Sequence, residues 1–286
     1  MRSGRRRLSL AWLATIPFFA YTFLFLFLPA GSVLLGAFKG VHGGYTAANI
    51  RLLFHHPYID AYKTSIEVSV VTAVLGGLVG LATAYAALRE GTPKWVRSMI
   101  TTFSGVAANF GGIPLAFAFI ATLGPLGVAT VFMKKQLHLD VYAHGFTLFG
   151  KTGVEIVYLY FQLPLMILVI SPAIDGLRKE WREASANLGA SSWQFWRYVG
   201  LPVLMPSILG AVILLFGNAF AAYATAYSLT SGTVNLVPIL IGAYYTGNVL
   251  DNPHLAQALA FGMFVVLALM MLAYIPLQRR AARWAK

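Results

Sequence analysis

The sequence predicts an all-α integral membrane protein that crosses the bilayer six times. Of its 286 residues, 58% are hydrophobic and only 10% are charged, whereas an ordinary soluble domain has about 25% charged residues. Six apolar stretches each approach the ~20 residues that a helix needs to cross a hydrocarbon core. The lysines and arginines lie mainly at the ends of these stretches. The formal net charge of +12 therefore indicates membrane topology rather than nucleic-acid binding.

The six predicted spans form one domain that covers residues 1–286. The first span follows the basic leader RSGRRRL, so a cleaved secretory signal is the alternative. Its apolar run exceeds the ~7–15 residues of a signal core, and we expect a span. The approximate limits are Trp12–Phe38, Thr64–Leu88, Met99–Leu123, Gly153–Leu177, Val203–Leu229 and Leu255–Leu277.

Positive charge is distributed unevenly across the predicted membrane. The side that holds both termini carries 15 of the 21 lysines and arginines, and the opposite side carries the other 6. Because cytoplasmic loops are enriched in lysine and arginine, we expect both termini in the cytoplasm. The chain has no cysteine and its histidines show no ligand spacing, so we expect no metal site.

Residues 145–152, GFTLFGKT, match the nucleotide-binding P-loop pattern at every specified position. Such a loop lies between a strand and a helix, and its backbone N–H groups and lysine bind phosphates. This match falls in the predicted external loop 124–152, where no sheet fits. Its variable positions include the bulky Phe146, Leu148 and Phe149, where a phosphate loop needs small residues. We therefore interpret the match as accidental and expect no nucleotide site in this chain.

The predicted cytoplasmic segment between the fourth and fifth spans, residues 178–202, reads RKEWREASANLGASSWQFWRYVGLP. The spacing of Trp181, Ala184 and Leu188 predicts one face of a short helix that stops at Gly189. Ser191 or Ser192 would cap a second short helix, and Pro202 would end it before the next span. An interfacial aromatic belt around Trp193 and Trp196 is the alternative interpretation. It does not explain the acidic and small residues of the first helix, which suit docking to another protein.

This segment resembles the EAA loop of permease subunits from binding-protein-dependent ABC importers. That pattern is E-A-A, three residues, G, nine residues, I, one residue, L-P, and we call residues 178–202 the EAA-like segment. Two positions depart from the pattern, with Ser185 for alanine and Val199 for isoleucine. The positions that align with the pattern, these two departures included, are Glu183, Ala184, Ser185, Gly189, Val199, Leu201 and Pro202.

The resemblance implies a type I ABC importer permease fold. It also implies a subunit that lies in the inner membrane of a bacterial cell and is not itself an enzyme. Two permeases, expected here to be different chains, would form the translocation pathway. Two cytoplasmic ATPase subunits would bind ATP and Mg²⁺, so no cofactor is expected in this chain, and an external solute-binding protein would deliver the solute. Glu183 would contact the ATPase, Gly189 would be the hinge between the two coupling helices, and Leu201 with Pro202 would join the fifth span.

Polar side chains at mid-depth are candidates for the substrate path, because they are costly in lipid and usually face a cavity or a neighbouring helix. In the third span, NFGGIP contains Pro114, which lacks an N–H and predicts a kink or break. The alternative for each candidate is a hydrogen bond that only packs the bundle. The candidates are Asn109, Tyr160, Gln162, Asn218, Tyr223 and Tyr227.

The six-span form with a long first span resembles the permeases that import polyamines, ferric iron or aminophosphonates, so a polyamine-like or similar small charged solute is favoured. Glu67 and Glu155 lie near the outer ends of their spans and would attract a cation, although charges at such edges also reach water. A stand-alone secondary transporter or channel is the alternative function. Such proteins show inverted repeats or ionisable residues at the midplane, and neither is evident in the sequence.

Overall fold

The computed structural model describes residues 11–40, 43–89, 91–247, 252 and 254–282, and apart from an isolated bridge between Lys39 and Tyr45 its regular structure there is helical. The elements are α1 (Ala11–Thr22), the π-turn η1 (Phe23–Phe27), α2 (Leu28–Gly36), α3 (Ala48–Leu52), α4 (Tyr58–Leu88), α5 (Lys94–Asn109), α6 (Gly112–Leu123), α7 (Val128–Gln136), α8 (Lys151–Asp175), α9 (Lys179–Asn187), α10 (Ser192–Phe195), the π-turn η2 (Trp196–Gly200), α11 (Leu201–Ala221), α12 (Ala224–Thr230), α13 (Val237–Thr246) and α14 (Leu255–Ala282).

Within these residues, six helical segments are long and apolar enough to cross a membrane, which confirms the predicted number of spans. Four of them agree with the predicted limits to within a few residues. The third and fifth differ, and both differences arise at breaks in a helix. The segments are Thr15–Gly36, Tyr58–Leu88, Gly112–Gln136, Lys151–Asp175, Ser192–Ala221 and Leu255–Arg279.

The third predicted span, Met99–Leu123, is not one helix. α5 ends at Asn109 and α6 begins at Gly112, so the break predicted around Pro114 is present. Gly112 has a φ of +69°, which a helix interior does not tolerate, and Pro114 then lies in the first turn of α6, where no N–H is needed. The apolar segment long enough to span runs on through α7 to Gln136.

The fifth predicted span, Val203–Leu229, is wrong at both ends. α11 stops at Ala221, where the chain becomes extended at Ala222, and Leu229 belongs to α12. At the other end Pro202 does not interrupt the helix, because α10, η2 and α11 form one helical run from Ser192. In the π-turn before Pro202, the Leu201 N–H bonds to the Trp196 carbonyl, five residues back. The wider turn accommodates a proline ring that would clash in a regular helix.

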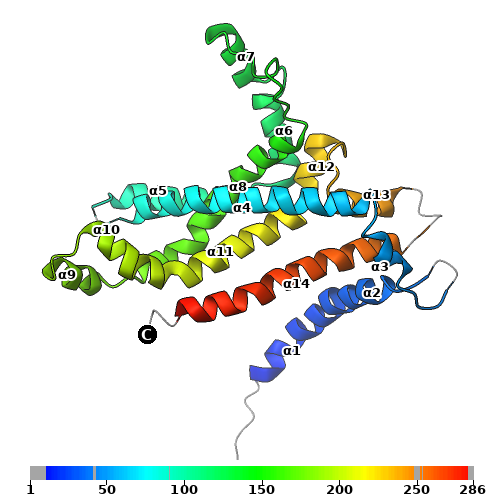
Figure 1. Cartoon of the computed structure of the whole chain (residues 1–286), viewed down its shortest axis with the longest axis horizontal. Helices are drawn as coiled ribbons and strands as arrows, with labels where there is room; N and C mark the ends of the chain where they lie inside the picture. The colour runs from blue at the N-terminus through cyan, green and yellow to red at the C-terminus, as the bar shows by residue number, and fades with distance from the viewer. Residues whose placement is uncertain (1–10, 41–42, 90, 248–251, 253, 283–286) are drawn as a thin grey trace, which may run out of the picture.

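The core of the bundle lies where α4 packs between α8 and α11 (Figure 1). Gly76 and Gly80 of α4 allow this close approach, since a Cβ on Gly80 would lie 2.6 Å from the Met166 Cβ. α14 covers α11, and α2 packs on α14. α6 and α7 extend away from the rest of the bundle (Figure 1).

The two ends of the bundle differ in what they carry. α9 and α10 lie at one end with the C-terminal end of α14, whereas α3 and α13 lie at the opposite end (Figure 1). The structure therefore places the EAA-like segment at one end of the helices that form the core.

Candidate functional site

The EAA-like segment forms two short helices joined at Gly189. The Ala190 N–H donates to the Ser185 carbonyl at 3.0 Å and the Gly189 N–H to the Ala186 carbonyl at 2.9 Å, which is the hydrogen-bond pattern of a Schellman motif. Gly189 has a φ of +78°, and a Cβ there would meet no atom within 4 Å. The position therefore needs glycine for its backbone conformation and not for lack of space.

The second helix of the segment begins with a capping box. The Ser191 hydroxyl accepts from the Gln194 N–H at 3.3 Å, and the Gln194 side-chain oxygen accepts from the Ser191 N–H at 2.7 Å. The two residues thus satisfy each other's free N–H groups at the helix start. Of the two serines considered from the sequence, the structure selects Ser191.

Trp196 anchors the segment to the bundle. Its ring meets Tyr85 of α4 edge to face, with centroids 4.7 Å apart. The ring also lies over Gly200, where a Cβ would come within 2.6 Å of it. Trp193 behaves differently and is 69% exposed, so of the two tryptophans only Trp196 is packed against the bundle. The sequence analysis did not identify Tyr85 or Gly200, although a glycine inside a helical pattern, here four residues after a tryptophan, is a signal of close packing.

The first helix of the segment, α9, presents its predicted docking face outward. None of its side chains is buried within the described chain. Glu183 and Ala184 are exposed, Ser185 is half-buried with its hydroxyl bonded to the Arg182 carbonyl, and Leu188 just after the helix is 87% exposed. An apolar side chain so exposed on a short amphipathic helix is available to a partner.

The later positions of the motif are partly covered by the bundle. Val199 and Pro202 are half-buried, and Leu201 is exposed where α11 begins. These three residues therefore lie along the run that leads from α10 into α11. Their role in coupling stays a prediction.

The breaks in the third and fifth spans lie next to each other. The Gly112 N–H, at the start of α6, donates to the Thr225 hydroxyl of α12 at 2.8 Å. The Tyr158 hydroxyl of α8 donates to the Ala222 carbonyl, between α11 and α12, at 2.7 Å. Backbone groups freed at helix ends need such partners when water is absent. We refer to residues 109–112 and 221–225 as the paired breaks.

Most of the predicted path residues lie at or near the paired breaks. Asn109 ends α5 and is exposed, and Tyr160 contacts Phe110 with ring centroids 6.3 Å apart. Asn218 is exposed in the last turn of α11. Tyr223 and Tyr227 stack with centroids 5.4 Å apart and are 37% and 48% exposed. These polar and aromatic side chains come from four helices and lie at or near the two interruptions.

Gln162 is the exception among the predicted path residues. Its side chain is fully buried between α4, α8 and α11, and its amide donates to the Leu215 carbonyl at 2.8 Å. Its side-chain oxygen has no partner among the described residues. This is the helix-packing contact that formed the alternative interpretation, so in a single chain Gln162 faces a helix interface and not a cavity.

The P-loop match does not form a phosphate site. Leu148 is fully buried, and Lys151 begins α8 and forms an ion pair with Glu67 of α4. In the part of the chain that the structure describes, no strand precedes the loop, and no group of three or more acidic, histidine or cysteine side chains is placed to hold a metal. The lysine charge is therefore used to join two helices.

The loop after α7 carries its own ion pair. Lys134 bonds to Asp140 at 2.8 Å, and this hydrogen bond lowers the pKa of the Asp140 carboxyl. The Tyr142 hydroxyl donates to the Leu123 carbonyl, and burial raises the pKa of Tyr142. These contacts hold the loop against the end of α6.

Comparison with known proteins identifies relatives over most of the chain. The model of a family described as binding-protein-dependent transport system inner membrane component matches residues 76–283. A probable sulfate transport system permease protein cysT from Nephroselmis olivacea is 24% identical over 243 residues, which cover 82% of this chain and 78% of that protein. A spermidine/putrescine transport system permease protein PotC homolog from Mycoplasma pneumoniae is 26% identical over 268 residues, with 87% and 84% covered.

A solved structure shares the fold. The crystal structure of a bacterial alginate ABC transporter, in complex with an alginate pentasaccharide-bound periplasmic protein, contains a chain that superposes with a TM-score of 0.71. The two chains are 20% identical, and the match covers 95% of this chain and 94% of that one.

The hydrogen bond between the breaks can be tested with Thr225→Val, which keeps the side-chain shape but removes the acceptor of the Gly112 N–H. A buried donor left without a partner costs about 1–3 kcal/mol. We expect Thr225→Val to lower the free energy of unfolding by this amount in detergent, and Thr225→Ser, which keeps the hydroxyl, to lower it less. Equal stability of the two variants would show that this bond does not hold the breaks together.

Proposed function

The chain belongs to the family of binding-protein-dependent transport system inner membrane components, and on that premise we propose that its solute passes beside the paired breaks. It is a permease subunit of an ABC importer, a multi-pass inner membrane protein and not an enzyme. Its fold is that of the type I importer permeases. The observation that carries the proposal is the meeting of two interrupted helices next to exposed polar side chains.

Interrupted helices are suited to a transport path, because backbone polar groups are tolerated at membrane depth only where protein or a cavity surrounds them. Asn109 and Asn218 each offer an amide that both donates and accepts hydrogen bonds. Tyr223 and Tyr227 add two stacked rings with hydroxyl groups. The pathway itself would form between this chain and a second permease, which we expect to be a different chain.

We favour a small hydrophilic cation of the polyamine type as the solute. The faces of tyrosine rings attract ammonium groups, and the stacked pair is exposed on the side of the breaks. The relative from Mycoplasma pneumoniae, a spermidine/putrescine permease homolog, aligns with 87% of this chain. An anionic solute such as sulfate is the competing candidate, supported by the relative from Nephroselmis olivacea.

The helical run from Ser192 to Ala221 would connect ATP hydrolysis to the path. Its 30 residues correspond to about 45 Å along the helical path. One end carries α10 of the EAA-like segment, and the other ends at the paired breaks. We expect a displacement of α10 to pass along this helical run to the wall of the path.

We propose that two cytoplasmic ATPase subunits dock on the EAA-like segments of the permease pair, with Glu183 and Ala184 at the contact. ATP and Mg²⁺ would bind to those subunits, and a solute-binding protein would approach the opposite end. The excess of lysine and arginine on one side supports cytoplasmic termini. In Figure 1, α9 and α10 lie at the same end as the C-terminal end of α14. This arrangement is consistent with a C-terminus on the same side of the membrane as the EAA-like segment.

Substitutions of Gly189 test the coupling role. Gly189→Val forces a β-branched residue to a φ of +78°, which costs about 1–2 kcal/mol for an L-residue in the left-handed region. Asparagine tolerates this region, so Gly189→Asn is the matched control. In the reconstituted complex we expect Gly189→Val to reduce solute uptake per ATP hydrolysed at least tenfold and Gly189→Asn to change it less than threefold. Equal coupling ratios for both variants would contradict a hinge at this position.

The stacked tyrosines test the path and the solute class together. Tyr223→Ala removes one ring and Tyr223→Phe keeps the stack, so we expect uptake of a diamine to fall about tenfold with alanine and less than threefold with phenylalanine. The measurement is uptake of radiolabelled putrescine and of sulfate by the complete complex. Uptake of sulfate and not of the diamine would overturn the solute class, and an unchanged Tyr223→Ala would overturn the path.

A further inference from the structure

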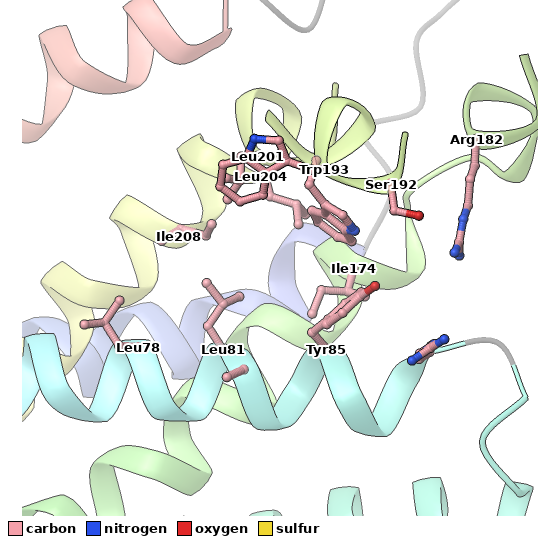
Figure 2. A pocket seen from close by; sticks show the side chains of 13 residues that line it. Leu78, Leu81, Tyr85, Ile174, Arg182, Ser192, Trp193, Leu201, Leu204 and Ile208 are labelled. Carbon is pink, nitrogen blue, oxygen red and sulfur yellow. The ribbon is translucent and has the colours of Figure 1, made fainter. Parts of the chain in front are cut away.

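A cavity of about 580 Å³ opens beside the EAA-like segment (Figure 2). Leu78 and Leu81 of α4 face Leu204 and Ile208 of α11 across it, and Trp193 lies at its edge (Figure 2). Ten of its thirteen lining residues are apolar or aromatic. Such a surface at the depth of a membrane needs a hydrophobic occupant.

A basic region adjoins this apolar cavity. A second cavity of about 680 Å³ shares Tyr85, Arg89, Ile174, Arg182 and Trp196 with the first. Among its described lining residues the only carboxylate is Asp175, which forms an ion pair with Arg97. The lining cations are Arg89, Lys94, Arg97, Arg178, Lys179 and Arg182.

The length of the apolar cavity matches one leaflet. From Leu78 to Arg89 the chain advances by eleven residues along α4, which is about 16 Å at 1.5 Å per residue. This is close to half of the ~30 Å hydrocarbon thickness. The basic region therefore lies at the depth of lipid phosphates when the apolar wall lies among acyl chains. The exposed Trp193 at the junction is the residue type that prefers this depth.

We propose that these joined cavities hold one anionic phospholipid. One acyl chain lies between Leu78, Leu81 and Ile208, and the phosphate lies between Arg89 and Arg182. Negative charge complements the surplus of cations, and arginine forms paired hydrogen bonds with phosphate oxygens. A transmembrane helix from a partner would need a groove through both leaflets. The apolar cavity is shorter, because its lining on α4 ends at Leu78.

The bound lipid would join parts of the chain that are far apart in sequence. Arg89 directly follows α4, Arg182 belongs to α9, and the apolar wall includes the start of α11. The phosphate would thus hold the docking helix to the bundle. The assignment to the cytoplasmic leaflet rests on the proposed function, whereas lipid binding itself is measured independently of transport.

Native mass spectrometry of the purified permease complex, titrated with phosphatidylglycerol and with phosphatidylcholine of the same acyl chains, tests the proposal. We expect one phosphatidylglycerol per copy of this chain to bind at least tenfold more tightly than phosphatidylcholine. Arg89→Gln with Arg182→Gln should remove this preference, and Arg279→Gln with Arg280→Gln, which removes the same charge from the end of α14, should keep it.

A second pair of variants tests the apolar wall. Ala82 lines the cavity, and its neighbour Thr83 does not, so Ala82→Trp should abolish the tight lipid and Thr83→Trp should retain it. Equal binding of the two lipids by the unaltered complex, or an unchanged lipid count in Ala82→Trp and in the Arg89 and Arg182 double variant, would overturn the proposal. Release of the ATPase subunits by the double variant without a change in lipid count would instead show that these arginines bind protein.

Discussion

The need to satisfy every backbone N–H and C=O group inside the membrane governs this structure. In lipid these groups have no water to bond, so an apolar chain forms continuous helices unless a specific partner replaces a lost bond. The two breaks meet this condition through the Thr225 hydroxyl, which accepts from Gly112, and the Tyr158 hydroxyl, which donates to Ala222. At Pro202 the π-turn η2 supplies the bond, because the Leu201 N–H donates to the Trp196 carbonyl and the helix stays continuous. A helix in this chain therefore breaks or continues according to whether hydrogen-bond partners are present for its backbone groups.

This distribution of breaks has a mechanical consequence. The run from Ser192 to Ala221 is helical throughout between the EAA-like segment and the path, and it stops where the path is proposed. Gly189 is the proposed hinge on the other side of α10, and Trp196 packs on Tyr85 of α4. On this proposal, a movement imposed on α10 passes through the helical run and displaces its end at the breaks.

The sequence was sufficient for the helical class, the number of spans, the stop at Gly189 and a serine cap, because these depend on hydropathy and on local backbone preferences. It was not sufficient for the limits at Met99 and Leu229 or for the effect of Pro202. A run of apolar residues reads the same whether its helix is continuous or broken, since the deciding hydrogen bonds join residues as distant as Gly112 and Thr225. The packing of Trp196 on Tyr85 and the burial of Gln162 between helices are likewise long-range contacts.

The account is tested most directly by electron spin resonance distances within the assembled complex. Because the chain has no cysteine, spin labels can be attached to pairs of introduced cysteines at the exposed positions Tyr198, Leu214 and Phe103. When ATP is trapped on the ATPase subunits, the distance from position 198 to 214 should stay constant while that from 214 to 103 in α5 changes. A changed distance from 198 to 214 with a constant distance from 214 to 103 would contradict transmission through a rigid helical run.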